Sequence, residues 1–485
     1  MHCLFLLTQV SVHMARYVPL RLGRPSLHSW HLLALSVLAV QHPLPLDIIG
    51  LEGPWDAQAI TERGFEALQT GQPHLASRLF TAGIARHGHD GSIFNNLAAA
   101  MATLGMEEGD GSLICEAIAA AQIAAALGYA GARELWQGIE SSTSTDHCKE
   151  QLPVKRDTLE QLLGGKLPLA EHIQLANTLC KEPGAVTLRP TVRERDLEMW
   201  TAAQLLRAWV LMRVCGVVSL EGILKEDTLA RVLQAQHDGH LSQNQKGRFE
   251  LPEAASRGSL RQEVQLPLQP PFTNPELCAS PLLRSVMKML LDERIEIDTF
   301  SYIESFPGSQ DQRWHNDVPT PAGQNCHMAP VGMVAVVPLV HVNASNGATE
   351  FLTGSHVDVE SGRFWMTEEG SDVNNATPHF QIPASVGTVL VFDLRLLHRG
   401  RANLADKSRP VLYMSYVREW FRDGVNFKDK QSRGWDALPL ASRRLFSRLD
   451  SRAYVTQLEE ALRALGGNID HLASDGDYTR RQLEL

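Results

Sequence analysis

The order of apolar and polar residues divides the chain into a helical first part and a strand-rich later part. From residue 57 to residue 127, apolar residues recur every three or four positions, the spacing that places them on one face of an α-helix. From residue 294 to residue 417, apolar runs are short and are separated by Gly, Pro and Asn. The pattern therefore predicts an α+β chain in which an all-α region precedes a β-sheet region.

The helical region has a 34-residue period, because Gly105 follows Gly71 by 34 positions. Small residues stand where neighbouring helices would cross, with Phe80 filling the space between them: Gly64, Ala76 and Gly83. This period resembles the tetratricopeptide repeat and predicts a repeat domain over residues 56–140 whose groove would dock a protein or peptide. In the second unit, residues 106–111 predict an inserted loop. A generic helical hairpin packed on a catalytic domain is the alternative.

The β region contains several short strands that can pair in an antiparallel sheet. They are expected at residues 295–303, 331–342, 380–382, 388–393 and 410–417. Such a series predicts a jelly roll, which binds ligands at its mouth. Residues 141–195 are expected to be a polar linker (141–153) followed by helices at 155–163 and 169–180. A further helix (196–214), a strand (216–220) and a helix (227–236) follow, and residues 426–485 form a charged tail with a helix at 455–464.

Composition narrows the class of protein only modestly. A length of 485 residues predicts two or three domains. A net charge of −10 gives no support to a nucleic-acid or anionic-membrane partner. The seven cysteines show no paired spacing, so we expect neither a zinc site nor disulfides, and a reduced compartment is favoured.

The first fifty residues resemble a targeting segment. Basic residues precede an apolar run at 30–40, and no acidic residue occurs before Asp47. The run is too short to span a bilayer comfortably, so we expect no transmembrane segment in the mature body. Residues 1–50 predict delivery to an organelle or the secretory pathway. A disordered or mis-annotated leader is the alternative, and it would leave the protein in the cytoplasm.

A His-x-Asp motif in the β region predicts a metal site. His315 and Asp317 lie two residues apart, so on a strand both side chains point to the same face. His398 follows the strand expected at 388–393 and comes from another part of the roll. Two histidines and one carboxylate bind one face of an octahedral Fe(II) and leave three positions open. We therefore predict that His315, Asp317 and His398 are the metal ligands and the catalytic residues.

A basic residue near the second histidine indicates the co-substrate. Arg409 follows His398 by eleven positions, and a guanidinium binds carboxylates through two parallel hydrogen bonds. We therefore predict that Arg409 binds a dicarboxylate such as 2-oxoglutarate. His356 lies in a Gly-Ser-His turn and is expected to be a loop residue near the rim. Three other histidines have no carboxylate two residues away on a strand: His327, His341 and His379.

Several segments resemble sequence blocks of the phytanoyl-CoA dioxygenase family. Residues 307–317 (PGSQDQRWHND) resemble its first metal motif, and residues 346–356 (NGATEFLTGSH) resemble its turn, with Thr353 in place of the usual proline. Residues 387–409 are similar to its final block, and residues 213–236 to its start. The resemblance implies a double-stranded β-helix (jelly-roll, cupin-like) catalytic domain at residues 196–425.

The resemblance also implies an activity. Such an enzyme would use Fe(II), 2-oxoglutarate and O2, with ascorbate in support, to hydroxylate a C–H bond and release succinate and CO2. Arg409 would bind the C5 carboxylate of 2-oxoglutarate. Related halogenases lack the metal carboxylate, so Asp317 favours hydroxylation. Some members have a serine two residues after the second histidine that helps to hold the dicarboxylate; Gly400 occupies that position here, which leaves the auxiliary contacts open.

These motifs do not encode the substrate. Members of the family act on varied small molecules, so we expect a small-molecule or lipid-like substrate. The helical repeats leave a second hypothesis, a protein hydroxylase of the prolyl type that docks a polypeptide. A third is an inactive repeat scaffold, against which the intact triad and Arg409 argue.

Overall fold

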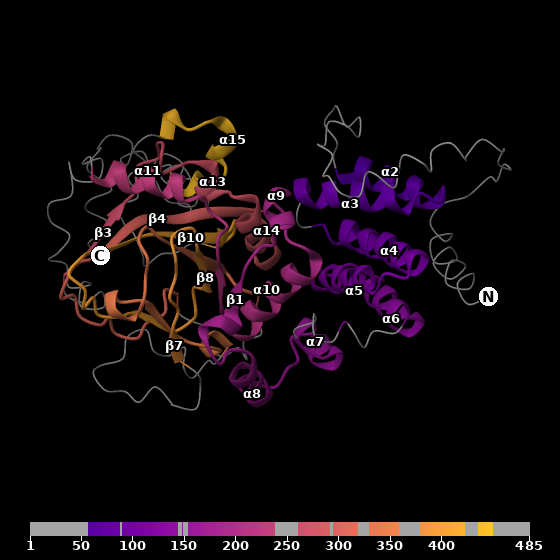
Figure 1. The fold of residues 1–485 in the computed structure, drawn as a ribbon, viewed down its shortest axis with the longest axis horizontal. Coiled ribbons are helices and arrows are strands. Elements are labelled where there is room, and N and C mark those ends of the chain that lie inside the picture. The colour runs from indigo at the N-terminus through magenta and orange to yellow at the C-terminus, as the bar shows by residue number, and fades with distance from the viewer. Residues whose placement is uncertain are drawn as a thin grey trace, which may run out of the picture. The chain divides into compact units, whose positions relative to one another are not determined.

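The computed structural model describes residues 57–87, 90–143, 148, 154–237, 260–291, 294–318, 329–357, 379–421 and 435–449. The chain divides into two compact units, Met1–Lys149 and Glu150–Leu485 (Figure 1). The expected targeting segment and the helix expected at 455–464 lie outside the described residues. Within the described part of the chain, no helix is long and apolar enough to cross a membrane.

The described part of the first unit is helical. Its helices are α2 (Ala57–Gln69), α3 (Pro73–His87), α4 (Gly91–Glu108), α5 (Gly111–Ala126) and α6 (Ala132–Ser142). Each helix packs against the next, and α4 also contacts α2 and α6 (Figure 1). Contacts between alternate helices are typical of stacked helical hairpins. The assignment to the tetratricopeptide family stays a prediction.

Glycine allows α2 and α3 to approach closely. A Cβ atom at Gly64 would lie 2.4 Å from Phe80 Cε1, and the Phe80 side chain is fully buried. Between α4 and α5, a Cβ atom at Gly105 would lie 2.7 Å from Ile114 Cδ1. Any larger residue at either position would force the neighbouring side chain to move, because protein interiors are close-packed.

The loop expected at residues 106–111 is much shorter than predicted. Helix α4 continues through Glu108, and only Gly109 and Asp110 separate it from α5. Gly109 has φ 67°, a left-handed conformation that glycine adopts without steric cost. Asp110 then accepts a hydrogen bond from the Ser112 amide and caps α5. The run was predicted to be a loop because it is acidic and contains glycine, but Glu107 and Glu108 belong to the last turn of α4.

Two disulfides correct the expectation of unpaired cysteines. Cys115 in α5 is bonded to Cys148, and Cys180 is bonded to Cys215, with separations of 33 and 35 residues. Linear spacing did not reveal these pairs, because helix packing brings the cysteines together. All four are fully buried, whereas Cys278 is a buried free thiol. Disulfides persist in oxidising compartments and are rare in reducing ones, so these pairs do not support the reduced compartment that was expected.

The second unit combines helices with two sheets. Its helices are α7 (Arg156–Leu163), α8 (Leu169–Leu179), α9 (Val192–Asp196), α10 (Ala202–Val214), α11 (Glu226–His237), α13 (Pro275–Cys278), α14 (Pro281–Leu290) and α15 (Leu440–Arg443). Its strands are β1 (Thr187–Leu188), β2 (Val217–Leu220), β3 (Arg261–Gln265), β4 (Ile295–Ser305), β5 (Gly332–Pro338), β6 (Thr349–Leu352), β7 (His379–Gln381), β8 (Val389–Asp393), β9 (His398–Gly400) and β10 (Arg409–Arg418). The helix expected at 196–214 begins later than predicted, because α10 starts at Ala202 and Asp196 is the last residue of the preceding helix α9.

The larger sheet has the order β1-β2-β8-β5-β10-β4-β3, and the smaller has the order β7-β6-β9. All pairs are antiparallel except β1 with β2. The sheets contact each other through aromatic rings. The ring centroids of Phe351 in β6 and Phe392 in β8 lie 5.2 Å apart. This two-sheet architecture with flanking helices is the expected cupin-like α+β fold.

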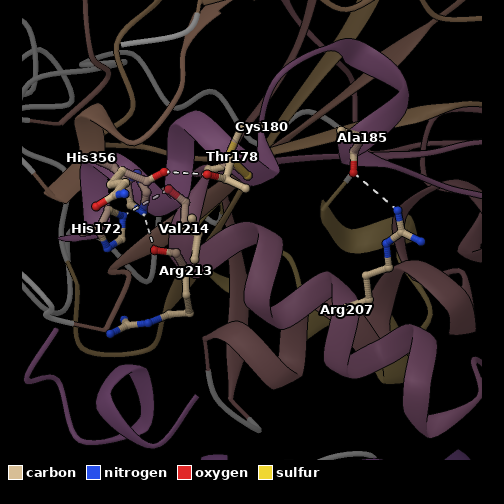
Figure 2. The surroundings of a disulfide bond; sticks show 10 residues. His172, Thr178, Cys180, Ala185, Arg207, Arg213, Val214 and His356 are labelled. Atoms are coloured by element: carbon tan, nitrogen blue, oxygen red, sulfur yellow. Dashed lines mark hydrogen bonds between the residues drawn. A yellow bond between two sulfur atoms is a disulfide. The ribbon is translucent and has the colours of Figure 1, made fainter. Parts of the chain in front are cut away.

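A polar cluster beside the second disulfide anchors the end of α10 (Figure 2). His172 Nε2 lies 3.1 Å from the Val214 carbonyl oxygen, and His356 Nε2 lies 3.2 Å from that of Arg213. These contacts satisfy carbonyl groups that a helix end leaves without intrahelical partners. Burial lowers the pKa of His356 to about 3, so its imidazole is neutral. His356 is therefore a fully enclosed structural residue, which corrects its expected place near the rim.

We predict that peptide mapping under non-reducing conditions will recover the Cys115–Cys148 and Cys180–Cys215 pairs. Cys278 should be alkylated only after unfolding, because its side chain is buried. Cleaving either disulfide should lower the free energy of unfolding by about 4 kcal/mol, the chain-entropy effect expected for a loop of this length. Complete alkylation of all four cysteines in denatured, unreduced protein would contradict the pairing.

Candidate metal and co-substrate site

A reciprocal backbone bridge brings the two predicted histidine ligands together. The His315 amide donates to the His398 carbonyl at 3.1 Å, and the His398 amide donates to the His315 carbonyl at 2.9 Å. His398 begins β9, whereas His315 belongs to an isolated bridge and not to the strand that was expected. The two rings lie 4.4 Å apart. The bridge fixes both side chains at the same place, although 82 residues separate them in the sequence.

The turn between β8 and β9 positions the third residue, Asp317. The carbonyl of Leu394 accepts hydrogen bonds from the amides of Asp317 and Val318, at 2.9 and 3.1 Å. The turn is held by a buried ion pair in which Arg395 Nη2 contacts Asp393 Oδ2 at 2.7 Å. Burial raises the pKa of the Asp393 carboxyl, but the Arg395 guanidinium outweighs this effect and leaves the pKa below its usual value.

The ligand atoms of His315, Asp317 and His398 all lie within 4.8 Å of one another. The Nδ1 atom of His315 lies 2.8 Å from the Arg313 carbonyl, and that of His398 lies 3.0 Å from the Leu396 carbonyl. Donation from Nδ1–H to a carbonyl makes Nε2 the unprotonated nitrogen, which is the form that binds a metal. Burial lowers the pKa of His398 to about 4, which keeps its ring in the neutral, ligating form. The donor set and its arrangement therefore fit a divalent ion such as Fe(II).

Two buried guanidinium groups meet at one serine hydroxyl. Arg409, the first residue of β10, donates from Nη2 to Ser305 Oγ at 2.7 Å, and Arg261 donates from Nη1 to the same atom at 2.6 Å. Strand register explains the meeting, because Ser305 of β4 is the direct partner of both arginines. Arg261 also donates from Nη2 to three backbone carbonyls, those of Gln310, Gly400 and Arg401.

The two arginines form a buried cationic site, and Asp311 acts on Arg261 by raising its pKa against the larger, opposite effect of burial. Burial and the nearby Arg261 lower the pKa of Arg409 to about 9, and burial lowers that of Arg261 to about 10. Within the described residues, neither guanidinium has a carboxylate at ion-pair distance, and the buried Nε atom of each has no hydrogen-bond partner. A dicarboxylate end would supply both the charge and the acceptors.

Ser301 is a further polar residue on the sheet face that carries Tyr413 and Arg409. In the β4–β10 register, Ser301 pairs with Tyr413 and Ser305 pairs with Arg409. These positions are four apart on both strands, so all four side chains share one face of the sheet. The Ser301 hydroxyl is buried without a hydrogen-bond partner in the described structure. This face therefore offers polar atoms to a ligand that extends from the triad towards Arg409.

The structure explains why position 400 is glycine. A Cβ atom there would lie 2.4 Å from Gln312 Oε1 and 2.9 Å from Arg261 Nη1. Gln312 uses that oxygen to accept a hydrogen bond from the Gly400 amide at 2.7 Å. The Arg261 guanidinium and the Gln312 amide thus occupy the space that a serine side chain would need.

The structure thus brings His315, Asp317 and His398 together, with Arg409 on the same inner face. Arg261 was missed, because it stands alone in a polar stretch with no motif around it. Among the other histidines, His341 and His379 lie outside the cluster, and His327 lies outside the described residues. Trp314 packs against Arg399, whose guanidinium carbon lies 4.6 Å from the ring centroid.

Comparison with known proteins agrees with the motifs. Residues 212–411 match the model of the phytanoyl-CoA dioxygenase family. A curated relative, dioxygenase af480 of Aspergillus fumigatus, is 27% identical over 163 residues, which cover 32% of this chain and 48% of the relative. The chain therefore matches about half the length of that relative.

Two solved structures resemble the second part of the chain at low similarity. The non-heme alpha-ketoglutarate-dependent epimerase SnoN of nogalamycin biosynthesis has a TM-score of 0.37 at 20% identity, covering 46% of this chain and 88% of SnoN. HygX of Streptomyces hygroscopicus, solved with nickel, 2-oxoglutarate and hygromycin B, has a TM-score of 0.34 at 16% identity. The match covers 44% of this chain and 87% of HygX. The family match rests on the sequence model and includes the triad and both arginines. Residues 212–411 therefore form a domain of the phytanoyl-CoA dioxygenase family.

Proposed function

We propose that this protein is an Fe(II)- and 2-oxoglutarate-dependent dioxygenase that hydroxylates a C–H bond of a small-molecule or lipid-like substrate. The observation that carries the proposal is the pairing of a His-Asp-His cluster with two buried arginines whose Nε atoms have no hydrogen-bond partner among the described residues. When bound, Fe(II) and 2-oxoglutarate supply the oxidative chemistry, which consumes O2 and releases succinate and CO2.

The protein's own residues perform two tasks in this proposal. His315, Asp317 and His398 hold the metal from one side, which leaves the other side to the co-substrate and O2. Arg409 and Arg261 bind the distal carboxylate of 2-oxoglutarate and thereby set its direction relative to the triad. Pairing with an anion also relieves the repulsion between the two buried cations. Related halogenases bind halide at the coordination position that the carboxylate would otherwise fill. Asp317 would occupy that position here, which supports hydroxylation.

A protein substrate is the second candidate, and one observation favours it. The first unit is a separate compact set of helices in which alternate helices contact each other, an arrangement used elsewhere for docking polypeptides. Adding the small-molecule and the protein fractions of one cell extract separately to the full-length protein would distinguish the candidates. A small-molecule substrate predicts that succinate formation rises only with the first fraction.

The triad predicts a specific pattern of activity loss. The purified protein supplied with Fe(II), ascorbate and 2-oxoglutarate should form succinate, and His315→Ala, Asp317→Ala and His398→Ala should each reduce the rate to background. His341→Ala is the matched control, since this histidine lies in the same unit but outside the cluster. Mass spectrometry of succinate provides the measurement. Wild-type rates in the triad variants, or an inert wild-type protein, would support the inactive-scaffold alternative.

Arg261 should determine affinity for the distal carboxylate. Arg261→Met should weaken 2-oxoglutarate binding by about 10- to 100-fold, because a charged hydrogen bond contributes about 1.5–3 kcal/mol. Arg261→Lys should retain part of the affinity, because it keeps the charge but not the planar geometry. Calorimetric titration of the metal-loaded protein with 2-oxoglutarate measures the dissociation constant of each variant.

Oxalate provides the control, because it chelates the metal but has no distal carboxylate. Its affinity should be unchanged in Arg261→Met. An equal loss of oxalate and 2-oxoglutarate binding would show that the substitution damaged the site as a whole.

A further inference from the structure

A tyrosine hydroxyl contacts the carboxylate of the triad. Tyr413 donates a hydrogen bond from its phenol oxygen to Asp317 Oδ2 at 2.6 Å. The other carboxylate oxygen, Oδ1, lies 4.0 Å from His398 Nε2 and thus faces that histidine. The two oxygens of Asp317 therefore have different neighbours, because Oδ1 lies near His398 Nε2 and Oδ2 accepts a hydrogen bond from a phenol.

Tyr413 is held in place by the most central part of the fold. Its strand, β10, lies between β4 and β5 and pairs with both along most of its length. The ring centroids of Tyr413 and Phe392 lie 6.4 Å apart, and those of Phe392 and His398 lie 4.6 Å apart. The backbone of Asp317 is fixed separately by the bond from its amide to the Leu394 carbonyl. The turn between β8 and β9 thus restrains the backbone of Asp317, whereas strand β10 restrains its side chain.

We propose that Tyr413 is a positioning residue that makes Asp317 a ligand through one oxygen only. A carboxylate whose Oδ2 accepts a short hydrogen bond is oriented to offer Oδ1 to the metal. Single-oxygen binding keeps three coordination positions open, whereas two-oxygen binding would occupy one of them. This inference rests on the proposed function, because it concerns the same metal site.

The test measures Co(II) binding by the full-length protein, without turnover. Tyr413→Phe keeps the ring and removes only the hydroxyl. We expect its dissociation constant for Co(II) to rise by about 10-fold, the lower end of the effect seen when a hydrogen-bond partner of a metal ligand is removed. The visible spectrum of the bound Co(II) should also change, because it depends on the number and arrangement of ligand atoms. The melting temperature of the metal-free protein should stay near that of wild type.

Tyr416→Phe is the matched control on the same strand. The Tyr416 hydroxyl donates to the Cys278 carbonyl at 2.7 Å, away from the triad. Its removal should lower the melting temperature and leave Co(II) affinity and the spectrum unchanged. If Tyr413→Phe binds Co(II) with the wild-type constant and spectrum, the positioning role is overturned while the metal site stands. If wild-type protein fails to bind Co(II), the proposed function fails and this inference fails with it.

Discussion

The buried ion pair between Asp393 and Arg395 is the constraint on which the candidate site depends. Both side chains are only 2% exposed, and Arg395 contacts Asp393 through Nε, Nη2 and its backbone amide. The pair fixes the turn whose Leu394 carbonyl holds the Asp317 amide and whose Leu396 carbonyl faces His398 Nδ1. A charge left alone at this depth would be strongly unfavourable, so the turn keeps one conformation. Two of the three candidate ligands are positioned by this single element.

The co-substrate region shows the opposite electrostatic situation. Asp393 and Arg395 neutralise each other, whereas Arg409 and Arg261 converge on a neutral hydroxyl. Burial disfavours both cations, so binding of an anion there stabilises the folded protein as well as orienting the ligand. The site is therefore complementary to a dicarboxylate in charge, and β10 connects this complementarity to the metal site by carrying both Arg409 and Tyr413.

The sequence was most informative where chemistry and periodicity coincide. The spacing of His315 and Asp317 and the strand before His398 predicted the cluster that these three residues form, whereas the role of Arg409 stays a prediction. Residues without a local pattern could not be found in this way. Arg261 becomes relevant only through the register of β3 and β4, and Tyr413 only through the register of β10. The disulfides were missed for the same reason, since helix ends bring Cys180 and Cys215 together.

The central claim is that one Fe(II) and one 2-oxoglutarate bind together at the triad and the arginine pair. Anaerobic titration of the metal-free protein, followed by visible absorption, tests it most directly. We expect a charge-transfer band that requires both components and saturates at one Fe(II) per chain. The band should be absent from Asp317→Ala. A folded wild-type protein that develops no band at saturating Fe(II) and 2-oxoglutarate would contradict the account.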